Sequence, residues 1–79
     1  MITKYIAKAL ERAAYEPIEH GSYCATVRGL RGVLATGPSV EECRQNLAEV
    51  VEEWLLVRVA KHLPIPTLGG VTIRVRRAS

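Results

Sequence analysis

The chain has 79 residues, of which 48% are hydrophobic, and its 11 basic and 8 acidic side chains give a formal net charge of +3. This length fits one domain, residues 1–79, and the apolar content excludes a disordered chain. No stretch approaches the ~20 apolar residues that span a bilayer, and no signal peptide follows Met1. We therefore expect a cytoplasmic protein with no membrane segment.

The first predicted element is a helix over residues 2–14. Its apolar residues, among them Ile2, Ile6 and Leu10, recur at steps of three and four, which is the spacing of one helix face. Basic residues fall mostly on the other side. The pattern predicts an amphipathic helix at the N-terminus.

Three short strands are predicted next, joined as an antiparallel meander. Residues 15–19 contain Pro17, which cannot donate to a ladder, so this strand is expected at an edge. Residues 23–27 alternate in polarity, and residues 33–36 follow after the turn RGLRG.

A long helix follows the third strand. Ser39 with Glu42 three residues on forms a capping box, which predicts a helix start. Apolar residues then continue at helical spacing, and we expect the helix to reach His62, because Pro64 cannot continue it.

The second half of this helix is unusually apolar. Residues 54–60 read WLLVRVA, which is apolar almost all the way round. A helix of this kind is buried on every side, and so short a chain cannot cover both faces by itself. We therefore expect a homo-oligomer, a dimer or tetramer, that associates through Trp54, Leu55 and Val59.

The last predicted element is a strand that begins at Val71, where apolar and polar residues alternate up to Arg76. After a long crossover helix it is expected to lie parallel to a strand of the meander. The predicted fold class is α+β: an N-terminal helix, a three-stranded antiparallel meander, a long helix and a final strand, with a β-β-β-α-β core.

The sequence offers no convincing catalytic or metal-binding pattern. The glycines between residues 29 and 37 lack the G-K-[ST] and G-x-G-x-x-G patterns of phosphate loops, so turns are the better interpretation. The candidate zinc ligands lack the close pairs of a structural site, and no third residue orients a cysteine–histidine pair. We expect no enzyme activity, no metal and no cofactor. The four candidate ligands are His20, Cys24, Cys43 and His62.

Charge is unevenly distributed along the chain. The long helix carries an acidic face that is suited to a basic partner, because complementary charge speeds encounter. The basic residues near the two ends favour an alternative, a nucleic-acid-binding module whose affinity falls steeply with salt. The four glutamates expected to bind the basic partner are Glu41, Glu42, Glu49 and Glu53. The basic set consists of Lys4, Lys8, Arg74, Arg76 and Arg77.

Residues 15–63 resemble the HicB-like antitoxin family. The resemblance is carried by a glycine-punctuated hairpin, a small residue and a glycine, a Ser/Thr cap and two glutamates at the start of a helix. The matching residues are Gly29, Leu30, Gly32, Val33, Ala35, Gly37, Ser39, Glu41, Glu42, Leu47 and Trp54.

The resemblance implies a partial RNase H-like fold and a specific partner. Members pair with a HicA-like toxin, a small basic protein that cleaves mRNA, and cover its active site. Many members carry a DNA-binding segment after this domain, which we do not expect in these 79 residues. The chain has no aspartate, so an RNase H-like metal site would be inactive. A further alternative is an oligomeric interaction protein without a toxin partner.

Overall fold

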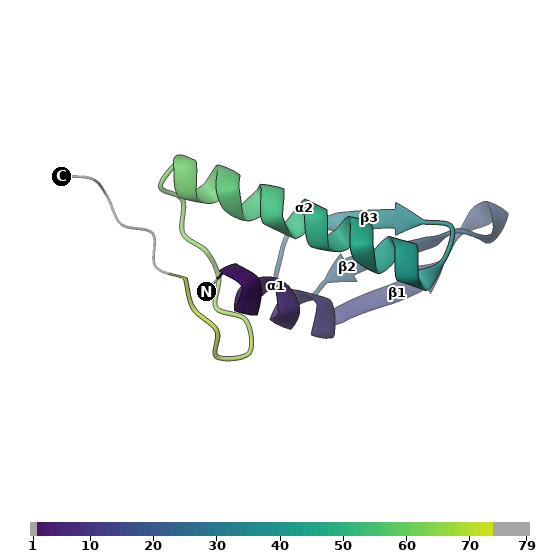
Figure 1. The fold of residues 1–79 in the computed structure, drawn as a ribbon, viewed down its shortest axis with the longest axis horizontal. Coiled ribbons are helices and arrows are strands. Elements are labelled where there is room, and N and C mark those ends of the chain that lie inside the picture. Colours follow the sequence, from purple (N-terminus) through teal and green to yellow (C-terminus); the bar gives the residue numbers. More distant parts are fainter. Residues whose placement is uncertain (1, 74–79) are drawn as a thin grey trace.

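The structure, a computed structural model, describes residues 2–73 (Figure 1). Within these residues, one α-helix precedes a three-stranded sheet and a second α-helix follows it, with a short 3-10 turn between the first two strands. In chain order the elements are α1 (Ile2–Glu11), β1 (Ala13–Pro17), η1 (Glu19–Gly21), β2 (Tyr23–Val27), β3 (Leu34–Gly37) and α2 (Val40–Ala60). The predicted α+β order of helix, antiparallel meander and long helix is confirmed.

The sheet has the order β1-β2-β3, and both pairs of strands are antiparallel. Ala13 lies opposite Val27, and Thr26 lies opposite Leu34. Because side chains alternate along a strand, Ala25, Val27 and Ala35 are buried on one face, while Thr26 and Leu34 are exposed on the other.

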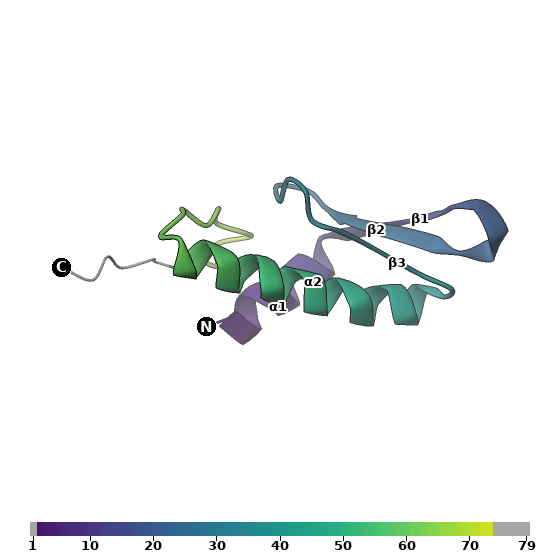
Figure 2. The same cartoon turned by 90° about the horizontal axis from the view of Figure 1, so that it is seen from above.

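The α2 helix covers the buried face of the sheet, so that sheet and helix form two layers (Figure 2). The α1 helix packs beside α2. The buried apolar side chains form one cluster, to which the segment after α2 also contributes. Its members are Tyr5, Ala9, Ala25, Val27, Leu30, Val33, Ala35, Cys43, Leu47, Val51, Leu55, Ile65 and Leu68.

The N-terminal helix is shorter than the predicted 2–14. It ends at Glu11, and β1 begins at Ala13 instead of Tyr15. Ala13 and Ala14 pair with β2, so strand pairing overrides a helical pattern that would otherwise continue through two alanines.

The predicted final strand is not a strand in its described part. Val71 makes only an isolated antiparallel bridge with Leu68. The two residues exchange backbone hydrogen bonds of 3.0 and 2.7 Å around Gly69 and Gly70, which both have positive φ. Such a two-residue turn folds Val71 back on its own segment instead of onto the sheet. The rest of the predicted strand, from Arg74 onward, lies outside the described residues.

Candidate functional site

The outer side of α2 is acidic from its first turn to Glu53. Ser39 caps the helix, because its Oγ accepts a hydrogen bond of 3.1 Å from the Glu42 amide. Buried residues then recur every four positions from Cys43 to Leu55, which fixes the side that faces the core. The glutamates on the other sides are all exposed, and this set, here called the acidic face, comprises Glu41, Glu42, Glu49, Glu52 and Glu53.

The glutamates of the acidic face form no salt bridge within residues 2–73. The one salt bridge of this part of the chain joins Lys8 to Glu11 on α1, over 3.2 Å. All four glutamates predicted for partner binding therefore present carboxylates to solvent, where a basic side chain of another protein has access to them.

After Glu53, the exposed side chains of α2 are apolar. The exposed fractions of Leu56, Val57 and Val59 are 53%, 50% and 40%. Leu63, just after the helix, is also 40% exposed. These four residues are here called the apolar patch, and it is the surface that the all-round apolar sequence of residues 54–60 led us to expect.

The prediction that Leu55 takes part in self-association is wrong. Leu55 is fully buried in the core of its own chain, because it is the last member of the four-residue series that begins at Cys43. Trp54 is half-buried and Val59 is exposed. Only Val59 of the three lies fully on the outer side.

The predicted basic set is only partly placed. Lys4 is exposed on α1, and Lys8 is held by Glu11 in a surface ion pair, an interaction that contributes little to stability. The other three members, Arg74, Arg76 and Arg77, lie outside the described residues.

The structure separates the candidate zinc ligands. His20 lies in η1 at the tip of the β1–β2 hairpin, whereas His62 follows the far end of α2 (Figure 1). In the part of the chain that the structure describes, no three histidine, cysteine or acidic residues lie close enough to hold a metal ion.

Cys43 is a structural thiol. Its side chain is fully buried, and the carbonyl oxygens of Ala35 and Tyr23, 3.5 and 3.6 Å from its Sγ, share its single S–H donor. Burial raises the pKa of this thiol, the neighbouring Cys24 raises it further, and a hydrogen bond from the Ala25 backbone opposes them. A thiol that is buried and protonated is a poor nucleophile.

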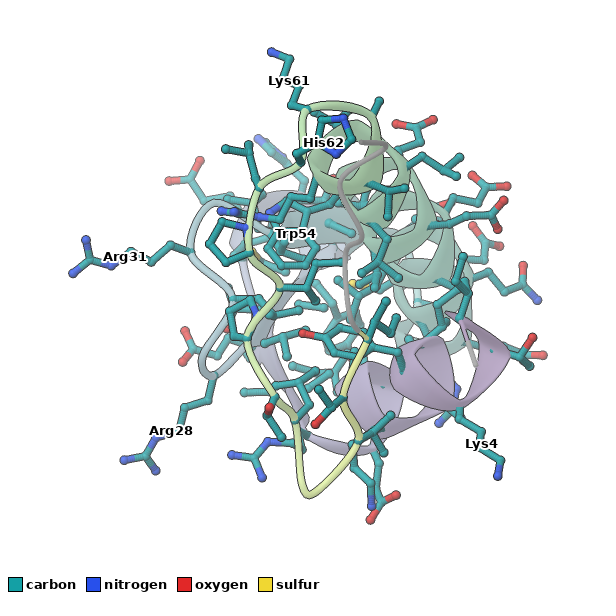
Figure 3. The ribbon with its side chains drawn as sticks, turned by 90° about the vertical axis from the view of Figure 1, so that its left-hand side faces the viewer. Lys4, Arg28, Arg31, Trp54, Lys61 and His62 are labelled. Atoms are coloured by element: carbon teal, nitrogen blue, oxygen red, sulfur yellow. The ribbon has the colours of Figure 1, made fainter. Side chains whose placement is uncertain are left out.

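A pocket that the sequence did not predict lies at the end of the molecule where α2 finishes. It has a volume of about 500 Å³ and is here called the end pocket. Figure 3 looks onto this end, with Trp54 near the middle and Arg31 projecting at one side. The lining residues are Val27, Gly29, Leu30, Arg31, Trp54, Arg58 and Pro66.

Arg58 is the central polar group of the end pocket. Its guanidinium carbon lies 4.6 Å from the centre of the Trp54 ring, a cation–π contact. Its Nη1 donates to the Pro64 carbonyl over 2.9 Å, while its Nε is buried without a hydrogen-bond partner among residues 2–73. No carboxylate within residues 2–73 neutralises this guanidinium.

Three distant parts of the chain build the end pocket. The β2–β3 turn brings Leu30 and Arg31, and its Gly29 and Gly32 have positive φ values of 99° and 77°. The segment after α2 brings Pro66, whose carbonyl accepts a hydrogen bond from the Tyr5 hydroxyl. Burial raises the pKa of Tyr5, and the charge of Arg58 partly opposes this.

One signal for the pocket was present in the sequence. Trp54 and Arg58 are four residues apart on a helix, which is the spacing of side chains in contact. The approach of Arg31 depends on how the turn packs against α2, and no local pattern encodes it.

Within residues 2–73, neither helix is both long enough and apolar enough to cross a membrane.

Comparison with known proteins gives a family and a structural relative. The model of a family described as UPF0150-like matches residues 4–66. The crystal structure of TTHA0281 from Thermus thermophilus is similar, with 38% sequence identity, coverage of 96% of this chain and 95% of that chain, and a TM-score of 0.87. A comparison with curated proteins found no match.

Proposed function

We propose that this chain, which belongs to the UPF0150-like family, acts by binding a protein partner and not by catalysis. The specific role is that of a HicB-like antitoxin: the chain binds a small basic HicA-like toxin and covers the active site with which the toxin cleaves mRNA. The resemblance of residues 15–63 to HicB-like antitoxins supports this role.

The observation that carries the proposal is the acidic face. Five exposed carboxylates lie on one helix of a chain whose net charge is +3, and none of them is paired within residues 2–73. Carboxylates left free in this way repel one another, and a basic partner relieves that repulsion. Complementary charge of this kind raises the association rate and selects against acidic partners.

The test begins with a pull-down of the tagged chain from its own cell lysate. The expected result is a small basic protein in stoichiometric amount, whose cleavage of RNA stops when the purified chain is added. Recovery of RNA, bound with a steep salt dependence, would favour the nucleic-acid alternative instead. Recovery of the chain alone would favour an oligomeric protein without a toxin.

A matched pair of variants then locates the interface. The double variant Glu49→Gln/Glu53→Gln removes two charges from the acidic face and is expected to slow association about tenfold at low salt. The control Glu16→Gln/Glu19→Gln removes two exposed charges from the β1–β2 hairpin and should leave the rate unchanged. Equal slowing by both pairs would mean that net charge matters, and not the acidic face.

We also propose that the apolar patch joins copies of the chain. Exposed leucine and valine side chains on one side of a helix favour burial against another apolar surface. Light scattering at micromolar concentration is expected to give the mass of a dimer or tetramer. Leu56→Gln with Val59→Gln should give the mass of one chain, and a monomeric parent protein would refute the association.

A further inference from the structure

We propose that the end pocket binds a small aromatic anion, with its planar ring against the apolar wall and its phosphate or carboxylate against Arg58. The Arg31 side chain extends outward from the rim of the pocket (Figure 3), and we propose that it turns in over the bound anion. The inference does not depend on the protein partner proposed above, because the pocket and the acidic face are made of different residues.

Size and lining favour a small organic ligand. A volume of about 500 Å³ falls within the usual range of ligand pockets. Val27, Leu30 and Pro66 supply apolar surface, and Trp54 supplies an aromatic ring. Such walls suit a flat ring, which buries its faces with little loss of conformational entropy.

The charge of the lining residues determines that the ligand is an anion. Among residues 2–73, two arginines line the end pocket and no acidic residue does. The Arg58 guanidinium lies beside the Trp54 ring, with one donor used by a backbone carbonyl and with no carboxylate partner within residues 2–73. A partly buried guanidinium without a counter-ion is costly, so an anion delivered from outside is favoured.

Arg58 also suits the geometry of the anion. A guanidinium presents its N–H donors in one plane, which matches the oxygens of a carboxylate or phosphate. The Trp54 ring and the Pro64 carbonyl restrict the movement of the Arg58 guanidinium. Ordering it on binding therefore costs little.

The only tryptophan of the chain provides the measurement. The indole N–H resonance of Trp54 in a nitrogen–proton correlation spectrum is unambiguous and reports on the pocket directly. The probes are adenosine monophosphate and naphthoate, which share a planar ring and an anionic group. Adenosine and hydroxymethylnaphthalene, which lack the charge, are their controls.

We expect both anions to shift the Trp54 resonance saturably and the uncharged controls to bind at least about tenfold more weakly. The better of the two anions shows whether phosphate or carboxylate is preferred. If neither anion shifts the resonance at millimolar concentration, or if the uncharged compounds bind equally well, the proposal is overturned.

A pair of variants in one turn isolates the pocket from general charge. Arg31→Gln removes a lining residue, whereas Arg28→Gln removes an equal charge from the same turn outside the lining. Both residues are exposed, so both variants should fold. We expect Arg31→Gln to weaken binding about tenfold and Arg28→Gln to leave it within about twofold, because salt screens exposed charges. An equal effect of the two variants would contradict a specific site.

Discussion

At the scale of single residues, Gly37 lies in close contact with the first turn of α2. It ends β3, and a Cβ atom added there would lie 2.6 Å from the Cys43 amide nitrogen and 2.9 Å from its Cα. These are backbone atoms of the first turn of α2, so they cannot rotate away as a flexible side chain would. The close approach of strand and helix requires a residue without a side chain.

Replacing Gly37 by alanine should therefore lower the free energy of unfolding, by about 1–3 kcal/mol, through overpacking. Urea denaturation measures the change. The matched control is Gly32→Asn in the β2–β3 turn, where an added Cβ meets nothing within 4 Å and asparagine tolerates the positive φ. Its loss should be smaller, and a Gly37→Ala protein as stable as the parent would contradict the close packing.

Cys43 predicts how stability changes with pH. Burial and the nearby Cys24 raise the pKa of its thiol above the ordinary 9.0, so the folded state keeps the proton longer than the unfolded chain. This contribution is complete below pH 9.0 and is lost as the pH rises from there through the higher pKa of the folded state. The free energy of unfolding should fall by up to about 1.36 kcal/mol per pH unit in that window.

Urea denaturation at a series of alkaline pH values measures this slope. In Cys43→Ala the free energy of unfolding should fall less steeply with pH just above pH 9.0, because the thiol is absent. The variant should also be less stable than the parent at every pH. Tyr5, whose pKa is also raised by burial, adds a slope of the same sign from its ordinary value of 10.0 upward. Identical slopes in the parent and the variant below pH 10.0 would show that the Cys43 thiol does not cause the loss of stability with pH.

At the scale of elements, one side of α2 packs in the core and the other side is exposed for contact with other molecules. One side buries a residue every fourth position and holds the core, while the other carries the acidic face and then the apolar patch. Neighbouring residues can therefore differ completely in what they do. Leu55 is 0% exposed and Leu56 is 53% exposed.

This division predicts opposite outcomes for two adjacent leucines. Leu55→Ala should lower the free energy of unfolding by about 2–5 kcal/mol, because it leaves a cavity in the core. Leu56→Ala should change the free energy of unfolding of the isolated chain by less than about 0.5 kcal/mol and weaken self-association instead. Denaturation at low protein concentration separates stability from association, and similar losses for the two variants would show that both leucines are buried.

At the scale of the whole molecule, the segment after α2 closes the end of the core. Ile65 and Leu68 are buried, and this segment is held by the Tyr5 hydroxyl at Pro66 and by Arg58 at Pro64. Tyr5 and Pro66 are 61 positions apart. A hydrogen bond between segments so distant joins the two ends of the described chain across the core.

Two tyrosine variants measure how much the Tyr5 hydrogen bond contributes to stability. Tyr5→Phe removes the long-range hydrogen bond and leaves the Pro66 carbonyl without its donor, so it should cost about 0.5–1.5 kcal/mol and speed hydrogen exchange at the Leu68 and Val71 amides. The Tyr15 hydroxyl is buried without a hydrogen-bond partner in the described part of the chain, so Tyr15→Phe should cost nothing or stabilise the protein. Equal costs for the two variants would mean that the Tyr5 hydrogen bond adds no stability.

Much of the fold could be predicted from the sequence, because the features concerned act between neighbours in the chain. The Ser39 cap, the glycine turns and the four-residue spacing along α2 each constrain the backbone within a few residues. The positions of the acidic face and of the apolar patch follow from the same helical period. These local rules hold whatever the rest of the molecule does.

Only the tertiary structure decided where α1 ends, which side Leu55 faces and that Arg31 reaches the end pocket. Helix propensity favours continuing through the alanines after Glu11, but pairing with β2 takes them into a strand. An all-round apolar helix does not reveal which side its own core will cover. A pocket made from a turn, a helix and a distant segment exists only after all three have packed, because its geometry depends on contacts between residues that no local pattern relates.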